Sequence, residues 1–406
     1  MNDNNNKKNV NILDFNTFIL PIILGFMVIG LAVFYWQSIA PKPVMIAYLY
    51  PASDAVPNIW LAPVDNPDEA RQATFSTIGI YDFAVDTQGK SIAFSMRNET
   101  NLARDIYLLD IASGNTERLT FCGDESAECF TPVFHPTNAV IAYTQLQVST
   151  PNDNTIPESD DPHAGHNHGS ISDTHIWVMD LDTGTKQPLG DDAQLVGHSP
   201  VWSDNGDTIA YYSANLDSQG VMVYNFNPEI DNSQTLNFIP SQNGSVGTLS
   251  PDGSQIIIPD IVNRNEQFFT YLRLIDFTET PVTFENFSDP DSPVDDISAK
   301  WHPNGERVTI SRRYTDSRWT RGYQLFDVDV ASGEVTTLLY DENYGHYFFE
   351  WDRLGDNLLL QRLPIQNADG TLNNLARPEI WVLNYESGDL FKIAESAYLP
   401  RWVIQE

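Results

Sequence analysis

The side chains best suited to binding chemistry lie in one short segment, SRRYTDSRWTRG at 311–322, which places four arginines beside Trp319. Arginine presents a planar fork of N–H donors that matches carboxylate and phosphate groups, and an indole ring adds a stacking surface. The segment therefore predicts a site for an anionic ligand or for an acidic part of a partner protein. The four arginines are Arg312, Arg313, Arg318 and Arg321.

A tract at 150–173 holds three histidines within six residues, with aspartates nearby. The histidines are His163, His166 and His168. Imidazole nitrogens bind Zn²⁺, Cu²⁺ and Ni²⁺, so the tract is a candidate site for a divalent metal. Its spacing matches no defined zinc motif, and a loop without a preformed cage binds metals weakly. The alternative is a solvated insertion, and we expect no other cofactor.

The chain has two cysteines, Cys122 and Cys129, whose spacing permits a local disulfide of the kind that forms in oxidising compartments. A redox or metal pair is less favoured, because the Cys-x-x-Cys spacing is absent. The sequence has no Gly-x-Ser-x-Gly elbow and no phosphate-binding glycine loop. These absences predict a protein without catalytic activity.

The elements that position these residues follow a repeat. Seven segments share a short strand with a large apolar residue, a turn and a second apolar strand, and the intervals between the large residues are 51, 68, 47, 52, 50 and 51. Turns such as Asn205-Gly206 and Asn304-Gly305 supply the positive φ angles that tight hairpins need. A second hairpin follows in most repeats. The large residues are Phe83, Phe134, Trp202, Leu249, Trp301, Trp351 and Trp402.

Four strands per unit at a period near fifty residues predict the blades of a β-propeller, with strands A to D in chain order. The last unit, 398–406, is an A strand alone. The first unit after residue 41 has strands B, C and D but no A. Pairing the two ends closes the ring and removes an open edge. We therefore predict an all-β fold, a seven-bladed propeller over 41–406 closed by the C-terminal strand, with a disordered histidine-rich insertion at 150–173.

The turns SDNG at 203–206, SPDG at 250–253 and HPNG at 302–305, each followed by an apolar strand, resemble the repeats of the TolB-like propeller family. The resemblance covers nearly all of 44–406. The family includes periplasmic envelope proteins, sensory domains of membrane-anchored regulators and the propeller halves of serine peptidases. The resemblance thus implies the fold and leaves several functions open.

Loops between strands B and C open on one face of a propeller, here called the B–C face. On or beside these loops lie nine of the 15 arginines, namely the four above and five others. We expect this face to contact a ligand or partner. The alternative is that its arginines pair with nearby carboxylates, which is common on acidic proteins. The five others are Arg97, Arg104, Arg264, Arg362 and Arg377.

Four polar residues precede the large residues of their repeats and should lie near the channel mouth: His198, His346, Asp295 and Asp296. Oligogalacturonate lyases are propellers with similar repeats and bind a metal through channel histidines. The resemblance therefore implies a metal-dependent lyase acting on acidic oligosaccharide as one alternative. Only two such histidines occur here, so a polar channel lining is the favoured interpretation.

A stretch without charged residues runs from 15 to 41. Its apolar part, 17–39, exceeds the roughly 20 residues that span a bilayer, so we predict a transmembrane signal anchor. Two lysines in the polar tail 1–16 precede it and the chain beyond is acidic, which places this disordered tail in the cytoplasm and the propeller in the periplasm. The alternative is a signal peptide cleaved after the small-x-small site at 38–40.

A formal net charge of −33 excludes a protein whose main task is to bind nucleic-acid phosphates. We expect a non-catalytic scaffold or adaptor of the cell envelope, held in the inner membrane by its own helix. An envelope protein or an anionic ligand would bind its B–C face. The alternatives are the lyase and a sensory domain of a membrane signalling system. Signalling would need a membrane partner, because the tail 1–16 is too short for a DNA-binding domain.

Overall fold

The structure is a computed structural model. The predicted tail 1–16, the predicted transmembrane helix 17–39 and the histidine tract 150–173 lie outside the residues that it describes. Within those residues, no helix is both long and apolar enough to cross a membrane. The described ranges are 44–53, 55–100, 102–148, 174–189, 196–215, 218–226, 237–278, 282–367 and 369–403.

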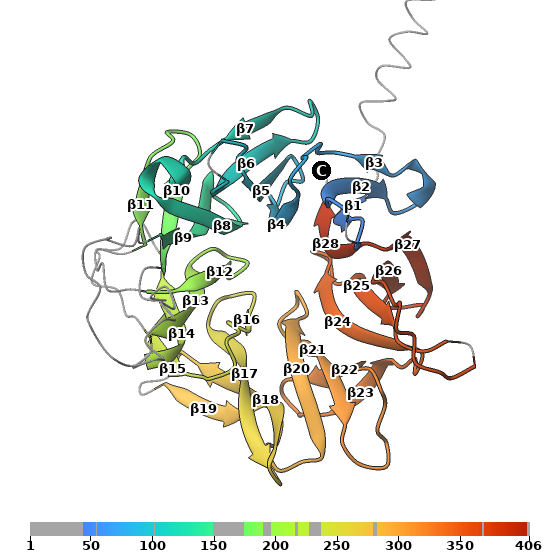
Figure 1. Cartoon of the computed structure of the whole chain (residues 1–406). Coiled ribbons are helices and arrows are strands. Elements are labelled where there is room, and N and C mark those ends of the chain that lie inside the picture. The colour runs from blue at the N-terminus through green and yellow to red at the C-terminus, as the bar shows by residue number, and fades with distance from the viewer. Residues whose placement is uncertain are drawn as a thin grey trace, which may run out of the picture. The chain divides into compact units, whose positions relative to one another are not determined.

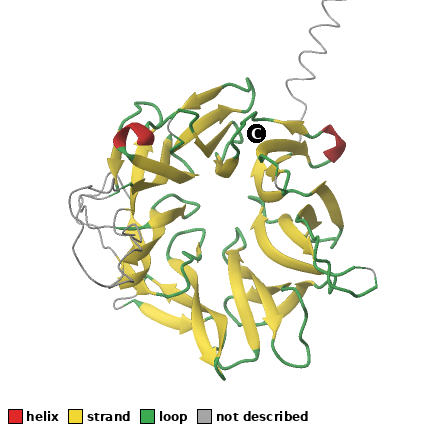
Figure 2. Ribbon diagram, in the orientation of Figure 1, coloured by secondary structure: helices red, strands yellow, loops and turns green. Residues whose placement is uncertain are grey.

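Seven four-stranded antiparallel sheets form the blades of a propeller (Figures 1 and 2). The predicted all-β, seven-bladed fold is confirmed. Two short 3₁₀ helices, η1 (Pro67–Glu69) and η2 (Cys122–Glu125), lie in connections. The strands of each blade are given below in the order A to D.

Blade 1 consists of β28 (Tyr398–Val403), β1 (Met45–Tyr50), β2 (Asn58–Pro63) and β3 (Arg71–Gln72). Blade 2 consists of β4 (Ile80–Val85), β5 (Ser91–Arg97), β6 (Arg104–Asp110) and β7 (Thr116–Arg118). Blade 3 consists of β8 (Ala127–Phe134), β9 (Val140–Gln147), β10 (Thr174–Asp180) and β11 (Lys186–Pro188). Blade 4 consists of β12 (His198–Trp202), β13 (Thr208–Asn215), β14 (Ser218–Asn225) and β15 (Asn237–Pro240).

Blade 5 consists of β16 (Thr248–Leu249), β17 (Gln255–Arg264), β18 (Gln267–Asp276) and β19 (Thr283–Asn286). Blade 6 consists of β20 (Val294–Trp301), β21 (Arg307–Tyr314), β22 (Gln324–Asp329) and β23 (Val335–Leu339). Blade 7 consists of β24 (Tyr344–Trp351), β25 (Asn357–Pro364), β26 (Glu379–Asn384) and β27 (Leu390–Glu395).

The two ends of the propeller chain meet in blade 1. Strand β28 pairs antiparallel with β1, and Trp402 lies opposite Ile46 while Arg401 lies opposite Ala47. The C-terminal strand thus supplies the A strand that the N-terminal blade lacks. The predicted ring closure is confirmed, and it leaves no unpaired A or B strand at the junction.

The hydrophobic core lies between the blades. The described residues form seven apolar clusters, one at each junction of neighbouring blades. At the junction of blades 5 and 6, for example, Ile257 and Leu272 pack against Trp301, Val308 and Ile310. Each sheet is therefore buried on both faces, which explains why its inner strands read as apolar runs.

Two histidines join the A–B turns of successive blades. The imidazole of His135 lies 3.1 Å from the Gly206 carbonyl through Nε2, and its ring packs edge-on against Trp202 with centroids 4.7 Å apart. His302 makes the same contacts with blade 7, where Nε2 lies 3.2 Å from the Gly355 carbonyl. A Cβ atom at Gly206 or Gly355 would lie 2.3 Å from the imidazole. Both turns therefore require glycine for space as well as for their φ angles of +80° and +77°.

The A strands carry bulges near the B–C face. The register of β20 shifts between Asp296 and Ser298, and that of β24 shifts between His346 and Phe348. A bulge bends the strand and turns the side chains before it to a new direction. These bulges decide where the predicted channel-mouth residues point.

Candidate ligand-binding cleft

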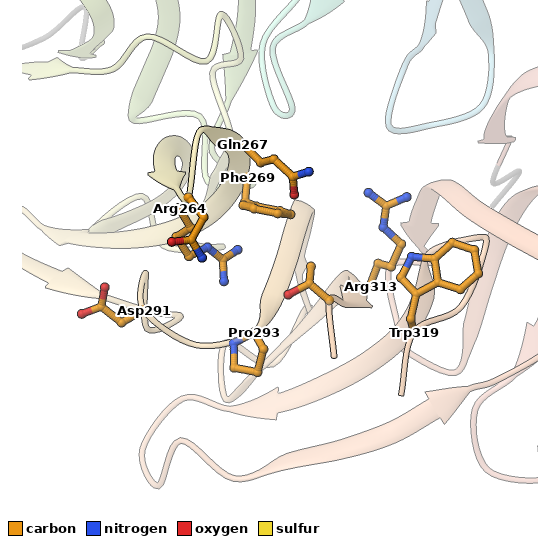
Figure 3. A pocket seen from close by; sticks show the side chains of 9 residues that line it. Arg264, Gln267, Phe269, Asp291, Pro293, Arg313 and Trp319 are labelled. Carbon is orange, nitrogen blue, oxygen red and sulfur yellow. The ribbon is translucent and has the colours of Figure 1, made fainter. Parts of the chain in front are cut away.

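A cleft of about 530 Å³ opens on the B–C face between blades 5 and 6. One wall is the tip of the β17–β18 hairpin and the other is the start of the blade 6 B–C loop (Figure 3). Its volume falls within the range of small-ligand sites, about 300–1,000 Å³. We call it the blade 5–6 cleft. Its lining residues are Arg264, Asn265, Gln267, Phe269, Asp291, Pro293, Arg313, Thr315 and Trp319.

Arg264 belongs to the hairpin wall. Its guanidinium donates to the carbonyls of Ser292 and Val294 and stacks over the Phe269 ring, with Cζ 4.1 Å from the centroid. Among the described residues, no carboxylate pairs with it. The charge of Arg264 is therefore stabilised by carbonyl dipoles and an aromatic face, without an ion pair to a described carboxylate.

Arg313 belongs to the opposite wall. Its Nη2 donates to Oδ2 of Asp295 at 2.9 Å, and its Cζ lies 4.6 Å from the centroid of Tyr323. The Tyr323 hydroxyl donates to the same Oδ2 at 2.6 Å, and the Thr270 N–H donates to Oδ1 at 2.9 Å. Burial and this hydrogen bond to Asp295 raise the pKa of Tyr323. Asp295 is thus shared between a cation and two neutral donors.

Trp319 stands at the rim of the cleft with 55% of its surface exposed. The loop below it is held by Asp316, whose backbone carbonyl accepts from the Trp319 N–H at 3.0 Å. The Arg318 guanidinium donates to the Asp316 carboxylate at 2.6 Å and lies 3.7 Å above the Tyr314 ring. Hydrogen bonds from the Arg318 side chain and backbone lower the pKa of Asp316 to about 2. Arg318 therefore orders the loop that presents the indole, and it does not line the cleft.

Two predicted ligand arginines are buried within the fold. Arg312 forms a two-pronged ion pair with Asp296, with Nε and Nη2 at 2.7 and 2.8 Å from its two oxygens. Arg362 is 1% exposed, donates to Asp341 at 2.5 Å and packs beneath the Tyr344 ring. These two guanidinium groups are occupied by local carboxylates, so they are not displayed to a ligand.

The remaining arginines lie apart from the cleft. Arg104 of blade 2 pairs with Glu128 of blade 3 at 2.6 Å. Arg97 and Arg377 are exposed, at the end of β5 and in the blade 7 B–C loop. Arg321 is half-buried, and its Nε has no hydrogen-bond partner in the described part of the chain. The structure therefore gathers Arg264, Arg313 and Trp319 and leaves the other predicted residues separate.

The predicted channel-mouth histidines lie in different blades. His198 begins β12, and its Nδ1 lies 3.0 Å from the Ser199 hydroxyl. His346 in β24 has no exposed surface, and its Nδ1–H donates to the Tyr323 carbonyl at 2.9 Å. Burial lowers the pKa of both rings, that of His346 to about 4. In the described ranges, no group of three or more His, Cys, Asp or Glu side chains is placed to hold a metal ion.

The predicted disulfide lies within the described residues, whereas the predicted metal site does not. Cys122 and Cys129 are joined by a disulfide between blades 2 and 3, with Cα atoms 6.0 Å apart. His163, His166 and His168 lie outside the described residues, so the structure does not bear on the metal prediction.

Several lining residues of the cleft carry no motif that sequence analysis would single out. Phe269, Pro293 and Thr315 are ordinary strand or loop residues, and they line a site because two blades meet there. The structure adds one signal: β17 and β18 have ten residues each, longer than the other described strands. The first strand of this long hairpin ends at Arg264, and the tip of the hairpin lies beside the arginine-rich segment of blade 6.

No family model and no curated protein matches the sequence. Solved propellers do match. The β-propeller domain of the Trilobed protease from Pyrococcus furiosus is 12% identical, with 87% of this chain and 97% of that chain covered and a TM-score of 0.56. Oligogalacturonate lyase in complex with manganese is 11% identical, with 87% and 85% covered and a TM-score of 0.51.

TolB from Acinetobacter baumannii is also among the similar structures, at 18% identity, with 74% of this chain and 68% of that chain covered and a TM-score of 0.41. Identities this low establish a fold and nothing about ligands. The two structures with TM-scores above 0.5 show that this chain shares their propeller fold.

Proposed function

We propose that this chain is a non-catalytic binding propeller of the cell envelope, anchored in the inner membrane by residues 17–39 with its propeller in the periplasm. The charge-free stretch and the lysines before it support this orientation. The Cys122–Cys129 disulfide also supports an oxidising compartment. Its task is to hold a partner protein or an anionic ligand on the B–C face.

The blade 5–6 cleft is the observation that carries this proposal. Arginine and tryptophan are the residues most enriched among those that dominate binding energy. Here Arg264 and Arg313 line opposite walls of the cleft, with Trp319 beside Arg313 at the rim (Figure 3). The Trp319 loop is held by its own hydrogen bonds, so little conformational entropy would be lost when a partner binds.

The test is chemical crosslinking in native membranes followed by recovery of the tagged full-length chain and mass spectrometry. Three proteins are compared: the wild type, Trp319→Ala, and Arg377→Ala as a control that removes an exposed arginine elsewhere on the B–C face. We expect one envelope protein to be recovered with the wild type and the control and to be lost with Trp319→Ala. Equal recovery with all three proteins would reject the cleft as the contact site.

A further inference from the structure

The blade 5–6 cleft presents two guanidinium groups that keep unused N–H donors. Arg313 donates one hydrogen bond, to Asp295, and no acceptor among the described residues meets its Nη1. Its side chain is 28% exposed, and its buried Nε has no hydrogen-bond partner among the described residues. Arg264 adds a positive charge that no described carboxylate neutralises. An incoming carboxylate would form charge-assisted hydrogen bonds here.

An apolar surface lies beside these cations. Trp319 is 55% exposed, Pro293 is exposed and Phe269 is half-buried, and all three line the cleft. An exposed indole held in place offers contact area for a flat or branched apolar group. A ligand that carries charge alone would leave this surface in water.

The cleft also contains an anion. Asp291 is exposed on the blade 5–6 connection, and its carboxylate makes no hydrogen bond or ion pair with any described residue. It would accept a hydrogen bond from an N–H group of the ligand. A polyanion would be repelled by Asp291 and by a chain of net charge −33.

We propose that the blade 5–6 cleft binds a peptide segment in which an acidic side chain adjoins a large apolar one. This inference rests on the proposed function and names the class of its partner. The acidic side chain contacts Arg313, the apolar side chain packs on Trp319, and a backbone N–H donates to Asp291. The amides of Asn265 and Gln267 pair with the peptide backbone.

An acidic saccharide is the competing ligand, because sugars also combine carboxylates with apolar ring faces. Two features favour the peptide. The Asp291 carboxylate repels a ligand with a negative charge on every unit, and peptides supply N–H donors at regular spacing. The experiment therefore includes a uronate oligomer.

The test selects phage-displayed random heptapeptides on the purified full-length chain in detergent micelles. We expect enriched sequences to carry Asp or Glu next to a large apolar residue. The enrichment should persist with Arg377→Ala and disappear with Trp319→Ala, an exposed residue whose removal leaves the core intact. Replacing Glu by Gln in a synthetic enriched peptide should weaken binding about tenfold or more.

Absence of an acidic consensus among the enriched peptides would overturn the peptide assignment. Binding of a galacturonate trimer that is lost with Trp319→Ala would identify an acidic saccharide as the ligand instead. Enrichment unaffected by Trp319→Ala would also overturn it. The crosslinking test is interpreted separately. Cleft-dependent recovery of an envelope protein without an acidic consensus rejects the peptide class and keeps the proposed function, whereas a consensus without such recovery rejects the envelope role and keeps the site.

Discussion

Replacing His346 by asparagine should remove part of the acid sensitivity of the propeller. The ring is fully buried, its Nδ1–H donates to the Tyr323 carbonyl, and burial lowers its pKa from 6.5 to about 4. The nearby Arg362 guanidinium also disfavours the charged ring, while the Asp341 carboxylate opposes both effects. In the unfolded chain the histidine has its ordinary pKa of about 6.5.

The sign of the effect follows from where the proton binds. Between about pH 6.5 and about pH 4 the unfolded chain takes up a proton that the native protein does not, so stability is lost as the pH falls. One pKa unit corresponds to about 1.4 kcal/mol. The depressed pKa of His346 therefore contributes a loss of about 2 kcal/mol between about pH 7 and about pH 4.5.

The assay is urea unfolding of the full-length chain in detergent micelles at both pH values. The variant His346→Asn keeps an N–H donor for the Tyr323 carbonyl and cannot titrate. The acidic groups titrate in both proteins, so the difference between wild type and variant isolates the histidine. We expect the variant to lose about 2 kcal/mol less than the wild type on acidification. Equal losses in the two proteins would refute a buried neutral ring.

Three further changes test the fold by thermal and urea unfolding. Gly355→Ala should cost about 1–3 kcal/mol more than Gly333→Ala, because φ is similar, +77° against +70°, but only the first Cβ meets an imidazole. Arg312→Met should cost about 3–5 kcal/mol by leaving Asp296 buried and unpaired, and adding Asp296→Leu should recover most of it. Deleting 398–406 should lower the free energy of unfolding by at least about 3 kcal/mol, because the burial of two core side chains of β28 is lost.

Each of these predictions has a contrary result. Equal losses for the two glycine variants would mean that the imidazole moves aside without strain. A double variant as unstable as Arg312→Met would mean that the arginine acts through packing and not through the buried carboxylate. An unchanged melting temperature after the C-terminal deletion would contradict ring closure.

The propeller could be predicted because its signals are local and repeated. Turns such as Asn304-Gly305 mark where strands A and B join, and the large residues mark the A strands. Closure followed from counting strands: the chain ends with an A strand and begins with a B strand. These features require no knowledge of how one blade packs on the next.

The partners of the arginines could not be predicted in the same way. Trp301 lies opposite Val308, and counting back from that pair would place Asp296 opposite Arg313. The bulge between Asp296 and Ser298 shifts the register by one, so Asp296 meets Arg312 instead. A single inserted residue in β20 thus decides which aspartate lies opposite each arginine.

The cleft itself arises between blades, and its lining comes from residues far apart in the sequence. The sequence indicated the face and three of the lining residues, Arg264, Arg313 and Trp319. It did not indicate Asp291, whose significance depends on lying in the same cleft as two arginines. A charged residue can be assigned to this site only once the packing of the two blades is known.

The most direct test of the binding cleft is a site-specific photocrosslink in native membranes. A photoreactive phenylalanine analogue replaces Gln267, an exposed residue that lines the cleft, or Leu354, which is 79% exposed in the blade 7 A–B turn on the opposite face. We predict a discrete crosslinked product from position 267 that is absent from position 354 and is lost when Trp319→Ala is added. Equal labelling from both positions, or a product at 267 that survives Trp319→Ala, would contradict the account.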